Sequence, residues 1–91
     1  MLKAFIVTSL LLAAAGNTAV AASPEFCADY STAAVRQAQA ARSNPACAPG
    51  AIGTRWSEQY GVHYGWCITA YPRAIEEERQ MRTRYLRSCR R

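Results

Sequence analysis

The stretch Thr54-Arg-Trp-Ser-Glu-Gln-Tyr-Gly-Val-His-Tyr-Gly-Trp-Cys67 holds both tryptophans, the single histidine and one of the four cysteines of this 91-residue sequence. Within it and just beyond it, residues of aromatic or apolar character recur at steps of three and four, which is the spacing of one helix face. We therefore predict a central helix whose inner face packs into the core of a small domain. The residues of that face are Trp56, Tyr60, His63, Cys67 and Ala70.

Two glycines interrupt this stretch. Gly61 and Gly65 lie four residues apart on one face of the expected helix, and each weakens a helix by up to about 1 kcal/mol relative to alanine. They either allow a close contact with another backbone or mark a broken helix. We favour the close contact.

The sequence before this stretch predicts a long first helix. Ser23-Pro24-Glu25 is a good helix start, because serine caps a helix and proline suits its first position. We expect this helix to run from Pro24 to Arg42 and to end at Ser43-Asn44-Pro45. Its expected inner face consists of Cys27, Tyr30, Ala34, Ala38 and Ala41.

The sequence after this stretch predicts a last helix from Pro72 to about Ser88. Three consecutive glutamates come early in it and arginines come late, which matches the helix dipole at both ends. Glu78 and Arg82 are spaced as a favourable pair on one helix face. The expected apolar set consists of Ala74, Ile75, Met81, Tyr85, Leu86 and Cys89.

The N-terminal residues have the three parts of a secretory signal peptide. Lys3 supplies a positive start, residues 4–15 are apolar, and Ala19-Val20-Ala21-Ala22 offers small residues for cleavage. The apolar run is well short of the roughly 20 residues that a membrane-spanning helix needs. We predict a signal peptide over residues 1–22, one mature domain over residues 23–91, no transmembrane segment after cleavage, and a periplasmic or secreted bacterial protein.

All four cysteines lie in the expected mature domain. An even number in an exported chain predicts two disulfides, and domains below about 70–80 residues usually need such staples. Four cysteines allow three pairings. If the first and last helices are antiparallel, Cys27 lies near Cys89 and Cys47 pairs with Cys67, and we favour this nested pattern. The predicted fold is thus an all-α, three-helix domain stapled by two disulfides.

Much of the mature chain also carries a known pattern. The pattern consists of Cys27-Ala-Asp-Tyr30, Ala34-Val-Arg-Gln37, Cys47, Gly53-Thr-Arg-Trp-Ser57, Tyr60, His63-Tyr64, Trp66-Cys67, Glu78, Leu86 and Cys89. It resembles a small proteobacterial family of secreted four-cysteine proteins of unknown function. This resemblance implies export and a helical fold, and it brings no activity, cofactor or catalytic residue. The chain departs from the family at Ala48, where the family tends to have glycine after its second cysteine.

Catalytic and metal chemistry find little support in the sequence. His63 and Cys67 have the spacing of a base beside a thiolate, but an even cysteine count leaves no spare thiol, so we favour a half-cystine and a core histidine. Zinc-binding cysteines usually lie two to four residues apart, and no two cysteines here are that close. Glu76, Glu77 and Glu78 are consecutive and point in different directions rather than forming a catalytic pair. We predict a non-enzymatic protein with no metal and no cofactor, and a small hydrolase is the least favoured alternative.

Two surfaces are candidates for binding a partner. Tyr64 and Trp66 lie off the inner face of the central helix, and both residue types favour interfaces. Arg84, Arg87 and Arg91 share a face at the end of the last helix, which suits phosphate or carboxylate groups. The simpler interpretation of the arginine end, which we favour, is a solvated final turn in a chain whose mature part has ten arginines against six carboxylates.

These observations predict a small binding or envelope-associated protein that meets a protein or an anionic envelope component. The alternative is a polyanion binder that uses its C-terminal arginines. Its partner would be lipopolysaccharide, a cell-wall polymer or, less favoured, nucleic acid.

Overall fold

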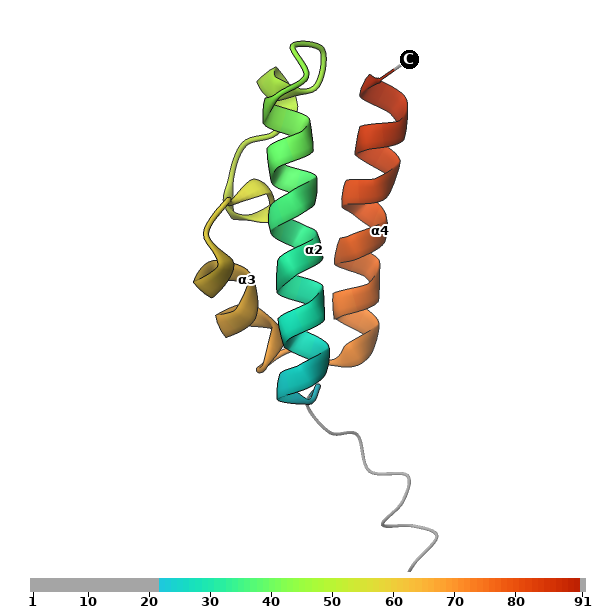
Figure 1. The fold of residues 1–91 in the computed structure, drawn as a ribbon. Helices are drawn as coiled ribbons and strands as arrows, with labels where there is room; N and C mark the ends of the chain where they lie inside the picture. The colour runs from blue at the N-terminus through green and yellow to red at the C-terminus, as the bar shows by residue number, and fades with distance from the viewer. Residues whose placement is uncertain (1–21, 91) are drawn as a thin grey trace, which may run out of the picture.

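The computed structural model describes residues 22–90, which form three α-helices and two short 3-10 turns (Figure 1). In chain order these are α2 (Pro24–Arg42), η1 (Ala48–Gly50), η2 (Thr54–Trp56), α3 (Tyr60–Cys67) and α4 (Pro72–Cys89). No strand occurs in this part of the chain, and none of its helices combines the length and hydropathy needed to cross a membrane. The predicted all-α, three-helix fold with two disulfides is confirmed. The predicted signal peptide, apart from Ala22, and Arg91 lie outside the described residues.

Helix α2 forms as its sequence predicts. The Ser23 side chain caps it by accepting a hydrogen bond from the Phe26 N–H at 3.1 Å, and Pro24 occupies the first turn. The buried residues recur at helical spacing, so one stripe of α2 faces the rest of the protein. The predicted inner face is confirmed, and Ser31 joins it: the buried set is Cys27, Tyr30, Ser31, Ala34, Ala38 and Ala41.

Helices α2 and α4 run in the same direction. Figure 1 shows both beginning at the lower end of the view and ending at the upper end, with the segment between them running back along α2. The disulfides consequently join Cys27 to Cys67 at the lower end and Cys47 to Cys89 at the upper end, with Cα–Cα distances of 5.7 and 5.1 Å. The predicted nested pairing is wrong, because the central segment, rather than α4, runs antiparallel to α2.

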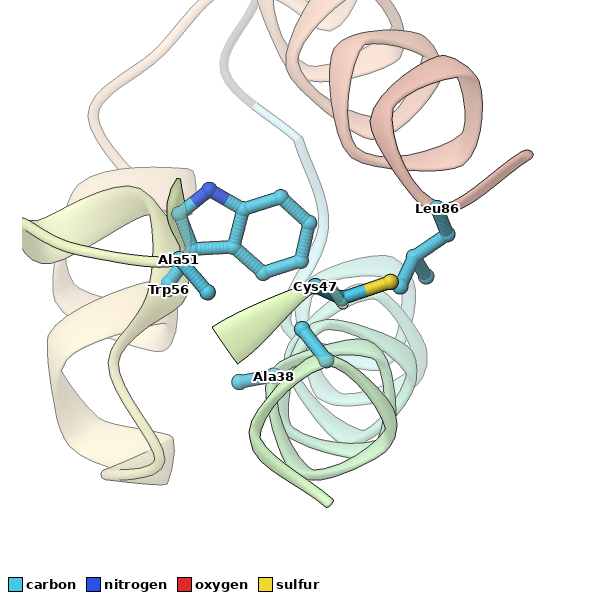
Figure 2. Close-up of a cluster of buried hydrophobic side chains, with 6 residues drawn as sticks. Ala38, Cys47, Ala51, Trp56 and Leu86 are labelled. Atoms are coloured by element: carbon cyan, nitrogen blue, oxygen red, sulfur yellow. The ribbon is translucent and has the colours of Figure 1, made fainter. Parts of the chain in front are cut away.

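Each end has its own cluster of buried side chains. The lower cluster consists of Cys27, Tyr30, Ala34, Cys67 and Ile75. The upper cluster consists of Ala38, Ala41, Cys47, Ala51, Trp56 and Leu86. Figure 2 shows the Trp56 indole beside Ala51 and directed toward Cys47, with Leu86 entering from the other side. The small residues of α2 let the central segment and α4 pack closely against it.

The predicted central helix is broken between η2 and α3. Ser57 and Gln59 have extended backbones, with ψ values of 141° and 117°, and the Ser57 hydroxyl accepts a hydrogen bond from the Gln59 N–H at 3.0 Å. Such local side-chain bonds compete with helix formation. Because of the break, Trp56 is buried while Tyr60, four residues later, is 44 % exposed. The predicted place of Tyr60 on the inner face is wrong.

The two glycines of α3 make no close contact. A Cβ atom built at Gly61 or Gly65 would meet nothing within 4 Å. The favoured interpretation of these glycines is therefore wrong. Helix α3 also runs unbroken through both of them, because the break in the predicted helix lies before them, at residues 57–59. His63 and Cys67 remain buried as predicted.

Candidate functional site

A cleft of about 650 Å³ lies where the two buried clusters meet, since Tyr30 of the lower cluster and Trp56 of the upper cluster both line it. Its lining comes from α2, η2, α3 and α4 and from residues 50–53. This volume falls within the roughly 300–1,000 Å³ of small-molecule sites. Its polar and aromatic lining includes Tyr30, Arg55, His63, Trp66, Glu78 and Arg82.

The guanidinium of Arg82 is buried beside this cleft, and only 1 % of the residue is exposed. Its Nε donates a hydrogen bond to Gln37 Oε1 at 2.7 Å, and its central carbon lies 5.1 Å from the centroid of the Tyr30 ring. Within residues 22–90 no group accepts a hydrogen bond from Nη1 or Nη2, and the buried Tyr30 hydroxyl also has no hydrogen-bond partner there. Three polar groups of one cleft are thus left without partners.

The carboxylate that the sequence assigned to Arg82 is bound elsewhere. Glu78 accepts two hydrogen bonds from Arg55, from Nε at 2.6 Å and from Nη2 at 3.1 Å. This bidentate pair raises the pKa of Arg55 above its ordinary value, chiefly through the hydrogen bond to Glu78. The predicted Glu78–Arg82 pair is therefore wrong. With two guanidinium groups and one carboxylate, the charged side chains of the cleft carry one positive charge in excess.

His63 supports the cleft wall rather than a catalytic pair. Its Nε2 lies 2.7 Å from the Ser57 carbonyl oxygen, and because a carbonyl only accepts, Nε2 carries the hydrogen. The ring lies edge-on to Tyr30, with centroids 6.4 Å apart. Cys67 is bonded to Cys27 and offers no thiolate, so the half-cystine interpretation is confirmed. No group of three metal-ligating side chains is gathered in the part of the chain that the structure describes.

The residues predicted to contact a partner fall in different places. Trp66 lines the cleft, is 39 % exposed and lies 6.0 Å from Tyr30 between ring centroids. Tyr64 is half-buried, stacks on Tyr60 and packs against the lower cluster, so it does not line the cleft. Arg84 and Arg87 are exposed on α4, away from the cleft. Among the predicted contact residues that the structure describes, which exclude Arg91, only Trp66 belongs to this site.

Sequence reasoning missed Arg82, although a signal for it is present. Arg82 follows Ile75 by seven residues and precedes Leu86 by four, so it lies on the buried stripe of α4. Spacing along the helix instead suggested a pair with Glu78, and arginine is rarely fully buried. An arginine at a core position of an amphipathic helix was the signal.

No protein-family model, curated protein or solved structure matches this chain. The resemblance to the secreted four-cysteine family therefore stays a prediction. The chemistry of the cleft is inferred from its own residues.

Proposed function

We propose that this protein is an exported, non-enzymatic binding module whose cleft holds an anionic group of its ligand against Arg82. The observation that carries this proposal is the buried guanidinium with two unpartnered Nη groups beside a cleft of ligand size. The Tyr30 hydroxyl, also unpartnered, offers a further hydrogen bond in the same cleft.

Energetics favour an anion at this position. Removing a charged group from water costs several kcal/mol, and the cost is recovered only when a counter-charge or good hydrogen bonds replace the water. Arg82 has one such bond, to Gln37, and its stacking on Tyr30. An anion would add charge-assisted bonds to both Nη groups, each worth about 1.5–3 kcal/mol. In the folded protein without a ligand, the desolvation cost of Arg82 is therefore only partly recovered, and a bound anion would recover more of it.

Export and a binding role fit the rest of the chain. Two disulfides persist mainly in oxidising compartments, which agrees with the signal peptide that the sequence predicts and with a periplasmic or secreted location. At the cleft, His63 is committed to Ser57, and Cys67 is committed to Cys27. Cys67 therefore offers no nucleophile, and the hydrogen bond of His63 holds the backbone of the cleft wall, which supports binding rather than catalysis.

Access to Arg82 requires a small movement. Each Nη atom exposes less than 1 Å², so a ligand oxygen, which is about as large as a water molecule, reaches it only when a side chain of the wall turns aside. We assign this movement to Trp66, because its indole is partly exposed and lies against the same Tyr30 ring that Arg82 covers.

A titration of the oxidised protein with sodium acetate, sulfate and phosphate at constant ionic strength tests the proposal. NMR should show saturable shifts at the Trp66 indole N–H, at Arg82 Nε and at the Tyr30 ring. Arg82→Met removes the charge while keeping a long side chain, and Arg73→Met, at an exposed arginine of the same helix outside the cleft, is the matched control. We expect Arg73→Met to keep the shifts and a folded Arg82→Met protein to lose them. Shifts retained in Arg82→Met, or absent from the unmodified protein with all three anions, would refute the proposal.

The arginine end of α4 remains a second candidate site. Arg84 and Arg87 are both exposed and line one shallow hollow with Met81, Tyr85 and Ser88. Such a site would bind lipopolysaccharide or another envelope polyanion in a salt-sensitive way. Replacement of Arg84, Arg87 and Arg91 by alanine should abolish that binding while Arg82→Met leaves it intact, and cosedimentation with lipopolysaccharide at low and high salt measures both. Binding by the triple variant equal to that of the unmodified protein would remove this candidate.

A further inference from the structure

Resting on the anion site proposed above, we infer that the ligand is a monocarboxylate with an apolar body. Its carboxylate pairs with the two Nη groups of Arg82, and its apolar part lies on Ile52, Val62 and Trp66 at the rim of the cleft.

The charges of the cleft select a single negative charge. Arg55 and Glu78 neutralise each other through their bidentate pair, which leaves Arg82 as the excess charge. A monoanion balances it. A dianion such as phosphate would bring its second charge near the Glu78 carboxylate, which lines the same cleft, and like charges at short distance repel.

The hydrogen-bonding geometry of Arg82 favours a planar ligand group with two acceptor oxygens. The Nε of Arg82 already donates a hydrogen bond to Gln37, so Nη1 and Nη2 are the groups left to bind a ligand. Nη1 and Nη2 lie in one plane and match the two oxygens of a carboxylate. The Tyr30 hydroxyl can donate to one of the same oxygens.

The rim of the cleft selects an apolar body. Ile52 is 75 % exposed, Val62 is 37 % exposed and Trp66 is 39 % exposed, and all three line the cleft. Single exposed apolar residues are ordinary, but a group of them at one cleft indicates a surface that a ligand covers. The loop that carries Ile52 is fixed on one side by the Cys47–Cys89 disulfide and on the other by η2, so this part of the rim is formed before a ligand binds.

Three matched probes separate the effect of charge from that of apolar contact. 3-Phenylpropanoate carries both features, 3-phenylpropan-1-ol lacks the charge, and acetate lacks the apolar body. Isothermal titration of the oxidised protein should show 3-phenylpropanoate binding at least about tenfold more tightly than either of the others, a difference of about one factor of ten in Kd for each feature. A comparison of octanoate with 3-phenylpropanoate then shows whether the cleft prefers an aliphatic or an aromatic apolar body. Tighter binding of either acid than of acetate supports the inference.

Variants assign each feature to its residues. Arg82→Met should remove the advantage of 3-phenylpropanoate over the alcohol, and Ile52→Ser should weaken 3-phenylpropanoate by about threefold, the effect of losing a small apolar contact, while leaving acetate unchanged. Arg73→Met, at an exposed arginine of the first turn of α4 that does not line the cleft, should change neither. If acetate or sulfate binds at Arg82 as tightly as both acids, the anion site stands and the inferred ligand class is wrong. If the alcohol binds as tightly as the acid, the inference is also wrong, and if no anion shifts the Arg82 resonances, both proposals fail.

Discussion

The lower and upper ends of the molecule are closed in different ways, although each contains one disulfide. At the lower end, Cys27–Cys67 joins two helices directly. At the upper end, Cys47–Cys89 joins α4 to a loop residue. That loop needs further contacts: the Tyr85 hydroxyl donates to the Cys47 carbonyl oxygen at 2.7 Å, and Arg42 Nη2 donates to the Trp56 carbonyl oxygen at 3.0 Å.

This difference shows how a short chain forms a cleft. At the lower end, α3 lies along α2 and one disulfide joins the two helices. The upper end holds its irregular segment by a covalent bond, an aromatic pair of Trp56 and Tyr85 with ring centroids 5.1 Å apart, and side-chain bonds to the backbone. Neither cluster includes Arg82, which lies at the join between them.

Removing either disulfide should have the largest effect. The bonds span 40 and 42 residues, and loops of this size predict a loss of about 4 kcal/mol each from the freed entropy of the unfolded chain. Urea unfolding of Cys27→Ser/Cys67→Ser and Cys47→Ser/Cys89→Ser measures both losses. Because the two loops are almost equal in length, any difference between the stability losses of the two variants reflects a difference in packing between the two ends. A loss below about 1 kcal/mol in either variant would contradict this account.

Hydrogen exchange on the same two variants locates the damage. Without Cys47–Cys89, amides of residues 43–59 should exchange fastest, because little regular structure holds them. Without Cys27–Cys67, the amides of α3 should lose protection instead. Equal loss of protection throughout both variants would show that the two ends open together.

The unfolding free energy of Arg82→Met tests whether Arg82, which lies between the two clusters, stabilises the fold. The variant loses the hydrogen bond to Gln37 and the stacking on Tyr30, which lowers stability. It also loses a buried and incompletely paired charge, which raises stability by more. We expect an unfolding free energy in anion-free buffer that is equal to or up to about 2 kcal/mol above that of the unmodified protein. Arg84→Met should leave it unchanged. Destabilisation of Arg82→Met by more than about 1 kcal/mol would assign Arg82 a structural role.

Alanine at two glycines should act in opposite directions at the two ends. At Gly50, a Cβ atom would overlap the Tyr85 hydroxyl, and displacing that hydroxyl from the Cys47 carbonyl oxygen should cost about 1–2 kcal/mol. At Gly65, the added methyl meets open space, and the better helix propensity of alanine should gain up to about 1 kcal/mol. Thermal unfolding compares the two variants, and effects of the same sign would reject the contrast.

The smallest expected effect concerns Glu76 on the surface of α4. A hydrogen bond from Arg79 lowers the pKa of Glu76 below its ordinary value. A lowered pKa in the folded state adds stability above the ordinary pKa of the carboxyl, and this contribution is lost as the pH falls through the lowered value. Arg79→Ala should return the pKa of Glu76 toward its ordinary value in an NMR titration. An unchanged pKa would exclude the pair as the cause.

The sequence was sufficient for elements governed by local spacing. The bounds and buried face of α2 follow from the Ser23 cap, the position of Pro24 and the recurrence of small residues. The direction of α4 was not predictable in this way, because it depends on the path of residues 43–71 through space. The break after Trp56 was not predicted, because the local bond between Ser57 and Gln59 that accompanies it leaves no trace in hydrophobic periodicity.

The candidate site was predictable only in part. Trp66, which lines the cleft, was predicted as a contact residue because it lies off the inner face of its helix. The pairing of Glu78 with Arg55 joins residues 23 positions apart, so spacing along α4 suggested Arg82 as the partner instead. The exposed apolar character of Ile52 and Val62 became meaningful only once the fold placed both at one cleft.

The connectivity of the two disulfides has a consequence for how the chain is oxidised. Each bond skips one cysteine in the sequence, so the loop closed by Cys27–Cys67 contains Cys47, and the loop closed by Cys47–Cys89 contains Cys67. When a chain is delivered to an oxidant with its N-terminus first, Cys47 is the first thiol that Cys27 meets. A Cys27–Cys47 bond formed at that stage is absent from the folded protein, and it has to be exchanged before Cys27 can pair with Cys67. Efficient maturation of this protein therefore calls for a thiol–disulfide isomerase, or for oxidation that waits until α3 has emerged.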